Sequence, residues 1–234
     1  MDMRSVVLSA TLTALIIILS LSASAQVANG SFESGSQNPG SAWLVLGAGS
    51  TAIDGWTIDQ GSIDYIGGWW PASDGVRSVD LNGLSTGQVS QYVPTVPGST
   101  YVVSFDMSGN SDGLPLVKQL TVMADGGQAA SFGYDIAASG NNRSDMKWVR
   151  QQYTFVAQSN WTLLAFASAT EGFFGPALDN VTVELRTPDP EPEPLAGICH
   201  RSNGKHGPKT LYVDPHAYPA HIAHGDTEGP CEVE

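Results

Sequence analysis

The stretch YVVSFDM at residues 101–107 decides the fold class of this chain. Its odd-numbered positions, from Tyr101 to Met107, are large and apolar, and the positions between them include Ser104 and Asp106. A period of two places successive side chains on opposite faces of a β-strand. The stretch therefore predicts a strand with one buried face and one partly polar face.

The same alternation recurs along residues 26–186. Apolar residues two positions apart occur at Trp56/Ile58, Ile63/Tyr65, Val79/Leu81, Leu120/Val122, Phe132/Tyr134/Ile136, Tyr153/Phe155, Leu164/Phe166 and Val181/Val183/Leu185. Turn-forming residues separate these segments, for example at Pro97-Gly98 and at residues 125–127. Because many short strands are typical of sandwiches and barrels, and several strands have one polar face, we expect an all-β sandwich of two sheets.

Composition excludes several other classes of protein. The chain has 234 residues, of which 26 are Gly and only 14% are charged, and this disfavours coiled coils and helical bundles. The formal net charge of −13 provides no basic surface for nucleic acid or anionic lipid. We therefore expect no nucleic-acid partner.

The first 25 residues have the features of a secretory signal peptide. A short segment with one basic residue, Arg4, precedes the apolar run 6–21, and Ala23-Ser24-Ala25 fits a small-residue cleavage site. The mature chain is expected to begin at Gln26 and to be secreted, at the cell surface or in the periplasm. No second apolar stretch long enough for a transmembrane segment follows in the sequence.

The mature chain has two compositional parts. All five His and both Cys lie in the last 36 residues, whereas all six Trp precede residue 162. Between them, residues 187–194 alternate Pro with Asp, Glu or Thr, a composition typical of an extended spacer. We expect a β-sandwich domain at 26–186, an acidic Pro-rich linker at 187–195 and a small Cys/His-rich module at 196–234.

Several motifs of the first domain resemble known families. Asn29-Gly30-Ser31-Phe32-Glu33 at its beginning and residues 175–183 at its end are similar to galactose-binding-like jelly rolls of carbohydrate-binding modules. Residues 55–58, 63–66, 74–83 and 101–110 resemble the bacterial choice-of-anchor C family, which is related to plant cell-wall proteins with a tandem domain of unknown function. The resemblance implies an antiparallel jelly-roll β-sandwich, an extracellular location and binding to polysaccharide or cell-wall glycan.

Catalytic chemistry has little support in the sequence. Two G-x-S-x-G matches occur, at 83–87 and 109–113, but residues 26–198 contain no His that could serve as the base. Many Asp residues are present, yet turn and strand-edge carboxylates usually bind backbone N–H groups. We therefore expect a protein that is not an enzyme.

Two carboxylates are candidates for a structural calcium site. The first and last strands of a jelly roll are neighbours, which would place Glu33 beside Asp179, and the related modules commonly hold calcium there. A hard cation would bind these oxygens together with backbone carbonyls. The alternative is that each carboxylate accepts hydrogen bonds from backbone N–H groups.

An aromatic cluster is the best candidate for a ligand site. Trp69 and Trp70 lie in a Gly- and Pro-containing segment after Tyr65, and two adjacent loop residues cannot both point into one core. An exposed indole offers a flat face to a sugar ring. Hydrogen bonds to the sugar hydroxyls would come from three further residues, Asp64, Asp74 and Arg77.

The C-terminal module leaves three interpretations open. Cys199 and Cys231 are expected to form a disulfide, because two Cys in a small exported module usually pair. His221 and His224 would share a face of a helical turn, and with His200 and Asp226 they could hold a zinc-type transition metal. Both features are compatible, and the histidines could also be plain surface residues.

Three functions follow from these features. The leading prediction is a non-catalytic glycan-binding or adhesion protein. The second is a structural component that binds proteins of the envelope or matrix. The third is a metal-dependent enzyme that uses the histidines of the C-terminal module.

Overall fold

The computed structural model describes residues 27–186, 195–201 and 207–231. The chain divides into two compact units, Met1–Arg186 and Thr187–Glu234. The predicted signal peptide (1–25) and almost all of the predicted linker (187–195) lie outside the described residues. Within the described ranges, no helix has the length and apolar character needed to cross a membrane.

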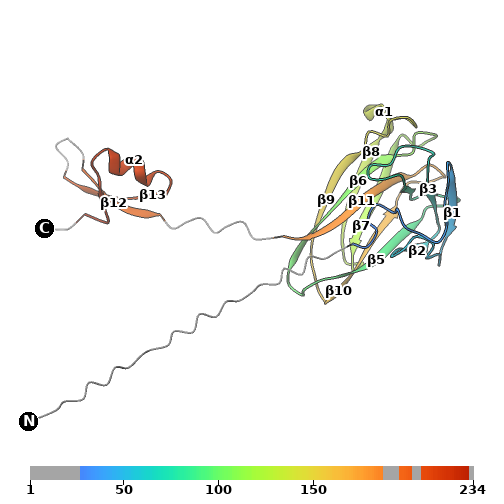
Figure 1. The fold of residues 1–234 in the computed structure, drawn as a ribbon, viewed down its shortest axis with the longest axis horizontal. Coiled ribbons are helices and arrows are strands. Elements are labelled where there is room, and N and C mark those ends of the chain that lie inside the picture. Colours follow the sequence, from blue (N-terminus) through green and yellow to red (C-terminus); the bar gives the residue numbers. More distant parts are fainter. Residues whose placement is uncertain (1–26, 187–194, 202–206, 232–234) are drawn as a thin grey trace, which may run out of the picture. The chain divides into compact units, whose positions relative to one another are not determined.

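The first unit consists of two antiparallel sheets, which confirms the predicted jelly-roll β-sandwich (Figure 1). One sheet contains, in spatial order, β1 (Trp43–Gly47), β3 (Ser62–Ile66), β4 (Ser78–Asp80), β11 (Pro176–Leu185), β6 (Thr100–Gly109) and β9 (Val149–Val156). The other contains β2 (Thr57–Gln60), β5 (Gln88–Pro94), β10 (Trp161–Ser168), β7 (Val117–Ala124) and β8 (Gln128–Asp135). A four-residue helix, α1 (Ile136–Ser139), follows β8 and is capped by Asp135.

The main core lies between the two sheets, and every second residue of a strand points into it. On β6, the apolar positions from Tyr101 to Met107 are fully buried, as the alternation predicts. Phe105 packs edge-on against Phe132 and Phe166 of the opposite sheet, at centroid distances of 5.2 and 5.3 Å. Aromatic pairs of this geometry add to the free energy gained by burial.

A second, smaller core lies on the outer face of the six-stranded sheet. It contains Ile66, Trp70, Met146 and Ala177, all of which are buried. Ile66 and Ala177 belong to β3 and β11 and alternate with residues that face the main core. The segment between β3 and β4, residues 67–77, contributes Trp70 and covers this face.

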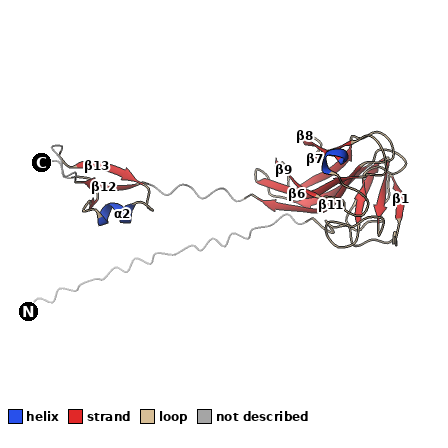
Figure 2. Ribbon diagram, turned by 90° about the horizontal axis from the view of Figure 1, so that it is seen from above, coloured by secondary structure: helices blue, strands red, loops and turns tan. Residues whose placement is uncertain are grey.

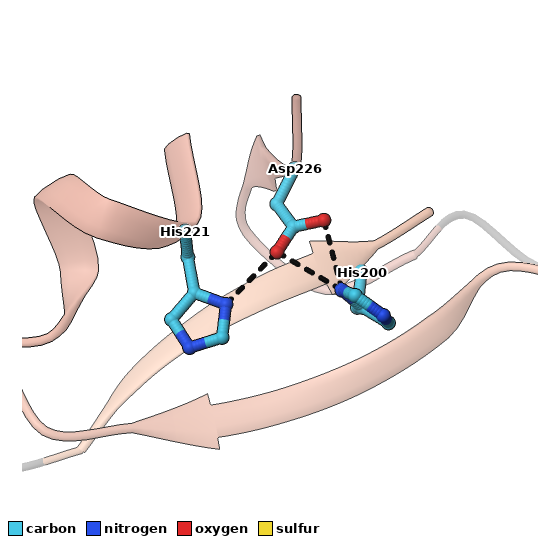
Figure 3. Close-up of side chains that lie close together, drawn as sticks. All are labelled: His200, His221 and Asp226. Atoms are coloured by element: carbon cyan, nitrogen blue, oxygen red, sulfur yellow. Dashed lines mark hydrogen bonds and ion pairs between the residues drawn. The ribbon is translucent and has the colours of Figure 1, made fainter. Parts of the chain in front are cut away.

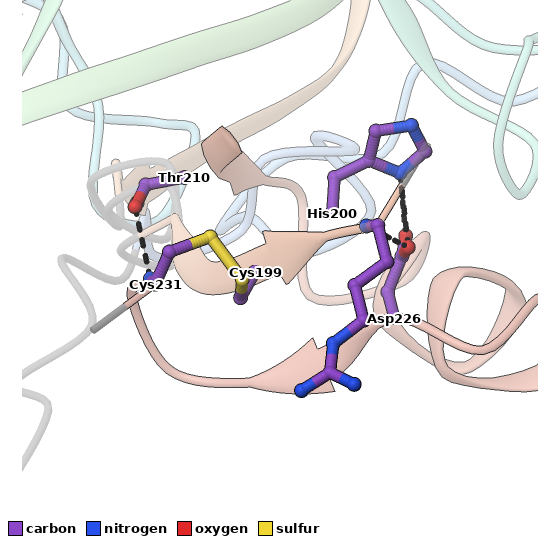
Figure 4. Close-up of a disulfide and its surroundings, with 6 residues drawn as sticks. Cys199, His200, Thr210, Asp226 and Cys231 are labelled. Atoms are coloured by element: carbon purple, nitrogen blue, oxygen red, sulfur yellow. Dashed lines mark hydrogen bonds and ion pairs between the residues drawn. A yellow bond between two sulfur atoms is a disulfide. The ribbon is translucent and has the colours of Figure 1, made fainter. Parts of the chain in front are cut away.

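The second unit is a small disulfide-closed module with a three-stranded antiparallel sheet. Its elements are β12 (Ala196–His200), β13 (Lys209–Val213), helix α2 (Tyr218–Ala223) and β14 (Thr227–Glu228), with the sheet order β13-β12-β14. Helix α2 is drawn in blue beside β12 and β13 in Figure 2. A disulfide joins Cys199 of β12 to Cys231, as predicted (Figure 4).

Candidate functional site

A cleft of about 340 Å³ lies on the outer face of the six-stranded sheet, where β1 and β3 meet four loops. Asp64, Asn110 and Asp112 are its charged or amide-bearing side chains. Most of the wall is apolar and is formed by Trp43, Val45, Ile66, Trp69, Trp70, Leu84, Phe173 and Phe174. A concave, mostly apolar site with a few polar groups is the usual form of a small-molecule site.

Strand pairing brings Trp43 to this cleft. β1 pairs with β3 so that Trp43 lies opposite Ile66, on the face that points away from the main core. Trp43 is 40% exposed, and its ring meets that of Trp69 edge-on at a centroid distance of 4.5 Å. The two indoles therefore form one aromatic surface, although 26 residues separate them in sequence.

Trp69 is held in place by polar contacts as well. The guanidinium of Arg143 lies 3.7 Å from the centroid of its ring, a cation–π contact. The indole Nε1 donates a hydrogen bond to Asp112 Oδ2 at 3.1 Å, and Arg143 donates to both oxygens of Asp112 at 3.0 Å. These contacts fix the indole before any ligand is bound, which lowers the entropic cost of binding.

Trp70, the adjacent residue, has a different environment. It is buried in the smaller core, and its Nε1 donates to Ser78 Oγ at 2.9 Å. Trp70 thus supports the floor of the cleft. Trp69 packs against the same smaller core but is only partly buried, and it also lines the cleft.

Asp64, which lines the cleft, faces a second, fully buried carboxylate, that of Asp80. Asp64 on β3 is directly opposite Asp80 on β4. Asp64 Oδ1 is buried without a hydrogen-bond partner among the described residues, and burial raises the pKa of Asp64 to about 7. Asp80 accepts hydrogen bonds from the backbone N–H groups of Asn82 and Gly175 and from Asn110 Nδ2. Burial nevertheless raises the pKa of Asp80 to about 8.

The other predicted ligand residues lie away from the cleft. Tyr65 alternates with Asp64 and therefore points into the main core, where it is fully buried. Its hydroxyl donates to the carbonyl of Phe32 and accepts from Arg77, each at 2.6 Å. Tyr65 consequently presents no ring face to a ligand. Arg77 and the exposed Asp74 lie in the segment between β3 and β4, outside the cleft lining.

Glu33 and Asp179 both bind the segment between β3 and β4. Glu33 Oε1 accepts from the backbone N–H groups of residues 76 and 77, at 2.8 and 2.7 Å. Asp179 is fully buried and accepts from the N–H groups of residues 73, 74 and 180. Burial raises its pKa to about 7 despite these bonds. Calcium would have to replace such donors, and the calcium site stays a prediction, testable by melting curves with and without a chelator.

The packing of residues 29–33 explains how Glu33 reaches the segment between β3 and β4. Gly30 accepts a hydrogen bond from the N–H of Val181 at 2.8 Å, beside a bulge in β11. A Cβ atom at position 30 would lie 1.9 Å from the carbonyl oxygen of Val181, so only Gly fits. The Asn29-to-Glu33 motif thus runs alongside the last strand, as the jelly-roll resemblance implies.

Three of the four predicted metal ligands of the C-terminal unit come together (Figure 3). His200 Nδ1 lies 2.9 and 3.0 Å from the two oxygens of Asp226, and His221 Nδ1 lies 2.9 Å from Oδ2. Hydrogen bonds from His200 and His221 hold the pKa of the buried Asp226 at about 2. His224 is exposed and stands apart from this group.

A second exposed aromatic pair lies on the five-stranded sheet. Trp161 on β10 and Tyr92 on β5 are 57% and 64% exposed, and both line a shallow groove. Trp161 pairs with Pro94, two positions from Tyr92, so the rings are diagonal neighbours on one face. This pair was not predicted from the sequence.

Comparisons with known proteins place the first unit in a family. The model of a family described as "Protein of unknown function (DUF642)" matches residues 25–184. Halomucin from Haloquadratum walsbyi is 33% identical over 169 residues, which are 70% of this chain but 2% of Halomucin. The chain therefore spans only a small part of that relative.

Solved carbohydrate-binding modules overlap the chain weakly. The family 35 module from Paenibacillus barcinonensis is 18% identical and covers 62% of this chain and 99% of its own, with a TM-score of 0.39. A family 4 module is 16% identical and covers 68% of this chain and 99% of its own, with a TM-score of 0.38.

Proposed function

We propose that this chain, which belongs to the DUF642 family, binds a neutral polysaccharide in the Trp43–Trp69 cleft without catalysis. The observation that carries the proposal is the fixed indole of Trp69 in an aromatic-walled cleft that also contains Asp64, Asn110 and Asp112.

The chemistry of the wall suits a sugar. A pyranose ring has an apolar C–H face, which packs on indole or phenyl rings, and a rim of hydroxyls that need hydrogen-bond partners. Trp43, Trp69 and Phe173, which is 60% exposed, supply aromatic rings for the C–H face. The carboxylates and the amide of the cleft supply hydrogen-bond partners for the hydroxyls. The volume of about 340 Å³ is at the lower end for ligand sites and fits a short segment of a longer chain.

Charge favours a neutral glycan over an acidic one. None of the described residues that line the cleft is Lys or Arg, and the guanidinium of Arg143, which lies on Trp69, is already paired with both oxygens of Asp112. The net charge of −13 adds a general repulsion toward anionic polymers. Uronate-rich or sulfated polysaccharides should therefore bind more weakly than neutral ones.

The arrangement of carboxylates supports binding rather than hydrolysis. Glycosidases generally need two carboxyl groups that flank a substrate bond. Asp80, which faces Asp64, is fully buried and bound by three donors, so it cannot reach a bound sugar. Asp112, the other carboxylate of the cleft, already accepts hydrogen bonds from Arg143 on both oxygens and from the Trp69 indole. The predicted signal peptide would deliver this binding protein to the surface or the medium, where such glycans occur.

The test uses the mature chain in affinity electrophoresis against a panel of neutral and acidic polysaccharides. Trp69→Ala should weaken binding of any retained neutral polysaccharide at least tenfold, which corresponds to about 1.4 kcal/mol. Trp161→Ala is the matched control, because it removes an exposed indole from the opposite sheet. Melting curves verify that both variants are folded.

Two outcomes would contradict the proposal. Failure of every polysaccharide to bind would leave the structural or protein-interaction role as the better account. Loss of binding in Trp161→Ala, with Trp69→Ala unaffected, would move the site to the Tyr92–Trp161 groove.

A further inference from the structure

We propose that His200, His221 and Asp226 bind one divalent transition-metal ion of the zinc type, which cross-links the C-terminal unit. The three residues come from separate places: the end of β12, helix α2 and the turn before β14. Figure 3 shows both imidazoles pointing at the carboxylate between them. This site is independent of the proposed polysaccharide cleft, which belongs to the other unit.

The distances fit a single ion. One ring nitrogen of His200, one ring nitrogen of His221 and a carboxylate oxygen of Asp226 all lie within 4.8 Å of one another. Ligand atoms of a tetrahedral zinc lie about 3.3 Å apart, since each is about 2.0–2.2 Å from the ion. The nitrogen-to-oxygen distances of 2.9–3.0 Å therefore need to open by only a few tenths of an ångström.

The donor set selects the class of metal. Two imidazole nitrogens and one carboxylate oxygen suit zinc and its neighbours in the first transition row. Calcium and magnesium prefer sites made wholly of oxygen. Three protein ligands leave one position of a tetrahedron for water or for another group.

The packing of the unit shows why a cross-link would matter. Of its described residues, only Ile198, Cys199 and Asp226 are buried. No residue of α2 is buried, so the helix has almost no hydrophobic attachment to the sheet. Units with so small a core usually need a disulfide or a metal.

The disulfide and the proposed metal would act at different places. Cys199–Cys231 attaches the C-terminal end of the unit to β12, and the neighbouring residue His200 faces Asp226 (Figure 4). The disulfide does not include α2. A metal bound through His221 would attach that helix to β12 and to the turn before β14.

Zinc binding to the untagged mature chain tests the proposal. The protein is stripped with a chelator, dialysed and titrated with zinc chloride in a calorimeter. One equivalent should bind in the micromolar range or tighter, and His221→Ala should weaken binding at least tenfold. Asp226→Asn should do the same, and it keeps an oxygen acceptor for the two histidines if the alanine variant fails to fold.

His224→Ala is the matched control, because His224 is exposed, directly follows α2 and lies outside the cluster. It should bind zinc as the wild type does. Absence of zinc binding in the wild type would overturn the proposal, and so would equal loss in His224→Ala and His221→Ala. Cobalt absorption in the visible range gives a second readout, since a tetrahedral site and an aqueous ion differ in intensity.

Discussion

Replacement of Asp64 by Asn should change how the stability of the sandwich depends on pH. Asp64 faces Asp80 across β3 and β4, and its Oδ1 is buried without a partner among the described residues. Burial raises its pKa from 3.8 to about 7. Between these values the native state keeps a proton that the unfolded state has lost, so stability falls as pH rises from about 4 to about 7.

The magnitude follows from the same two values. For a fully buried group, the difference between 3.8 and about 7 corresponds to about 4 kcal/mol. Asp64 is only partly buried, so solvent screening reduces this to about 2 kcal/mol. Asn cannot ionise, and Asp64→Asn should therefore be about 2 kcal/mol more stable than the wild type well above pH 7 and similar to it near pH 4. For a domain of this size, a gain of about 2 kcal/mol raises the melting temperature by about 4–8 °C.

Tryptophan fluorescence is the suitable assay, because all six Trp precede residue 162 and report on the sandwich alone. Melting curves are recorded from pH 4 to above pH 8 for the wild type, Asp64→Asn and Asp54→Asn. Asp54 is exposed, and its variant should follow the wild type at every pH. Equal pH profiles for Asp64→Asn and wild type, or a less stable variant at high pH, would refute the reasoning.

Two further predictions concern the attachments of each unit. Asp179→Ala should cost about 2–4 kcal/mol in urea unfolding, because three backbone N–H donors lose a buried acceptor; a cost below about 0.5 kcal/mol would contradict this role. The double variant Cys199→Ala/Cys231→Ala should lose about 3–4 kcal/mol in the C-terminal unit, as expected for a link across 32 residues. Trypsin should then cleave after residue 209 more readily, while the fluorescence melting of the sandwich stays unchanged; equal cleavage of variant and wild type would count against it.

The alternation of apolar residues was sufficient to predict the sandwich. On β6 and β11 a polar residue almost always separates two that face the core, and the period of two leaves no other regular structure. The disulfide followed from two Cys in one short module that was expected to be exported. Both predictions rest on local patterns, which a single sequence contains.

The cleft depends on pairings that a single sequence does not contain. Phe173 lies 104 residues after Trp69 in the sequence. Trp43 reaches the cleft only because of the register in which β1 pairs with β3. One signal was present: Trp43 and Val45 put two large apolar residues on the face of β1 opposite Leu44 and Leu46. Tyr65 was assigned to the ligand site because it is close in sequence to Trp69 and Trp70. Successive side chains of β3 point to opposite faces, however, so Tyr65 points into the main core and Asp64 points toward the cleft.

The C-terminal cluster shows the same limit of sequence spacing. A helical turn would put His221 and His224 on one face, but α2 ends at Ala223 and His224 lies beyond it. The ligand set is completed instead by His200, which the pairing of β12 with β14 brings to Asp226.

The most direct test of the central claim is an NMR titration that follows the six indole N–H signals of the mature chain as a neutral oligosaccharide is added. A saccharide from whichever polysaccharide is retained in electrophoresis serves as the probe, and single Trp→Phe variants assign the signals. The account predicts that the signals of Trp43 and Trp69 shift with saturation while those of Trp56 and Trp161 stay in place. Shifts of Trp161 with Trp43 and Trp69 unmoved would contradict it.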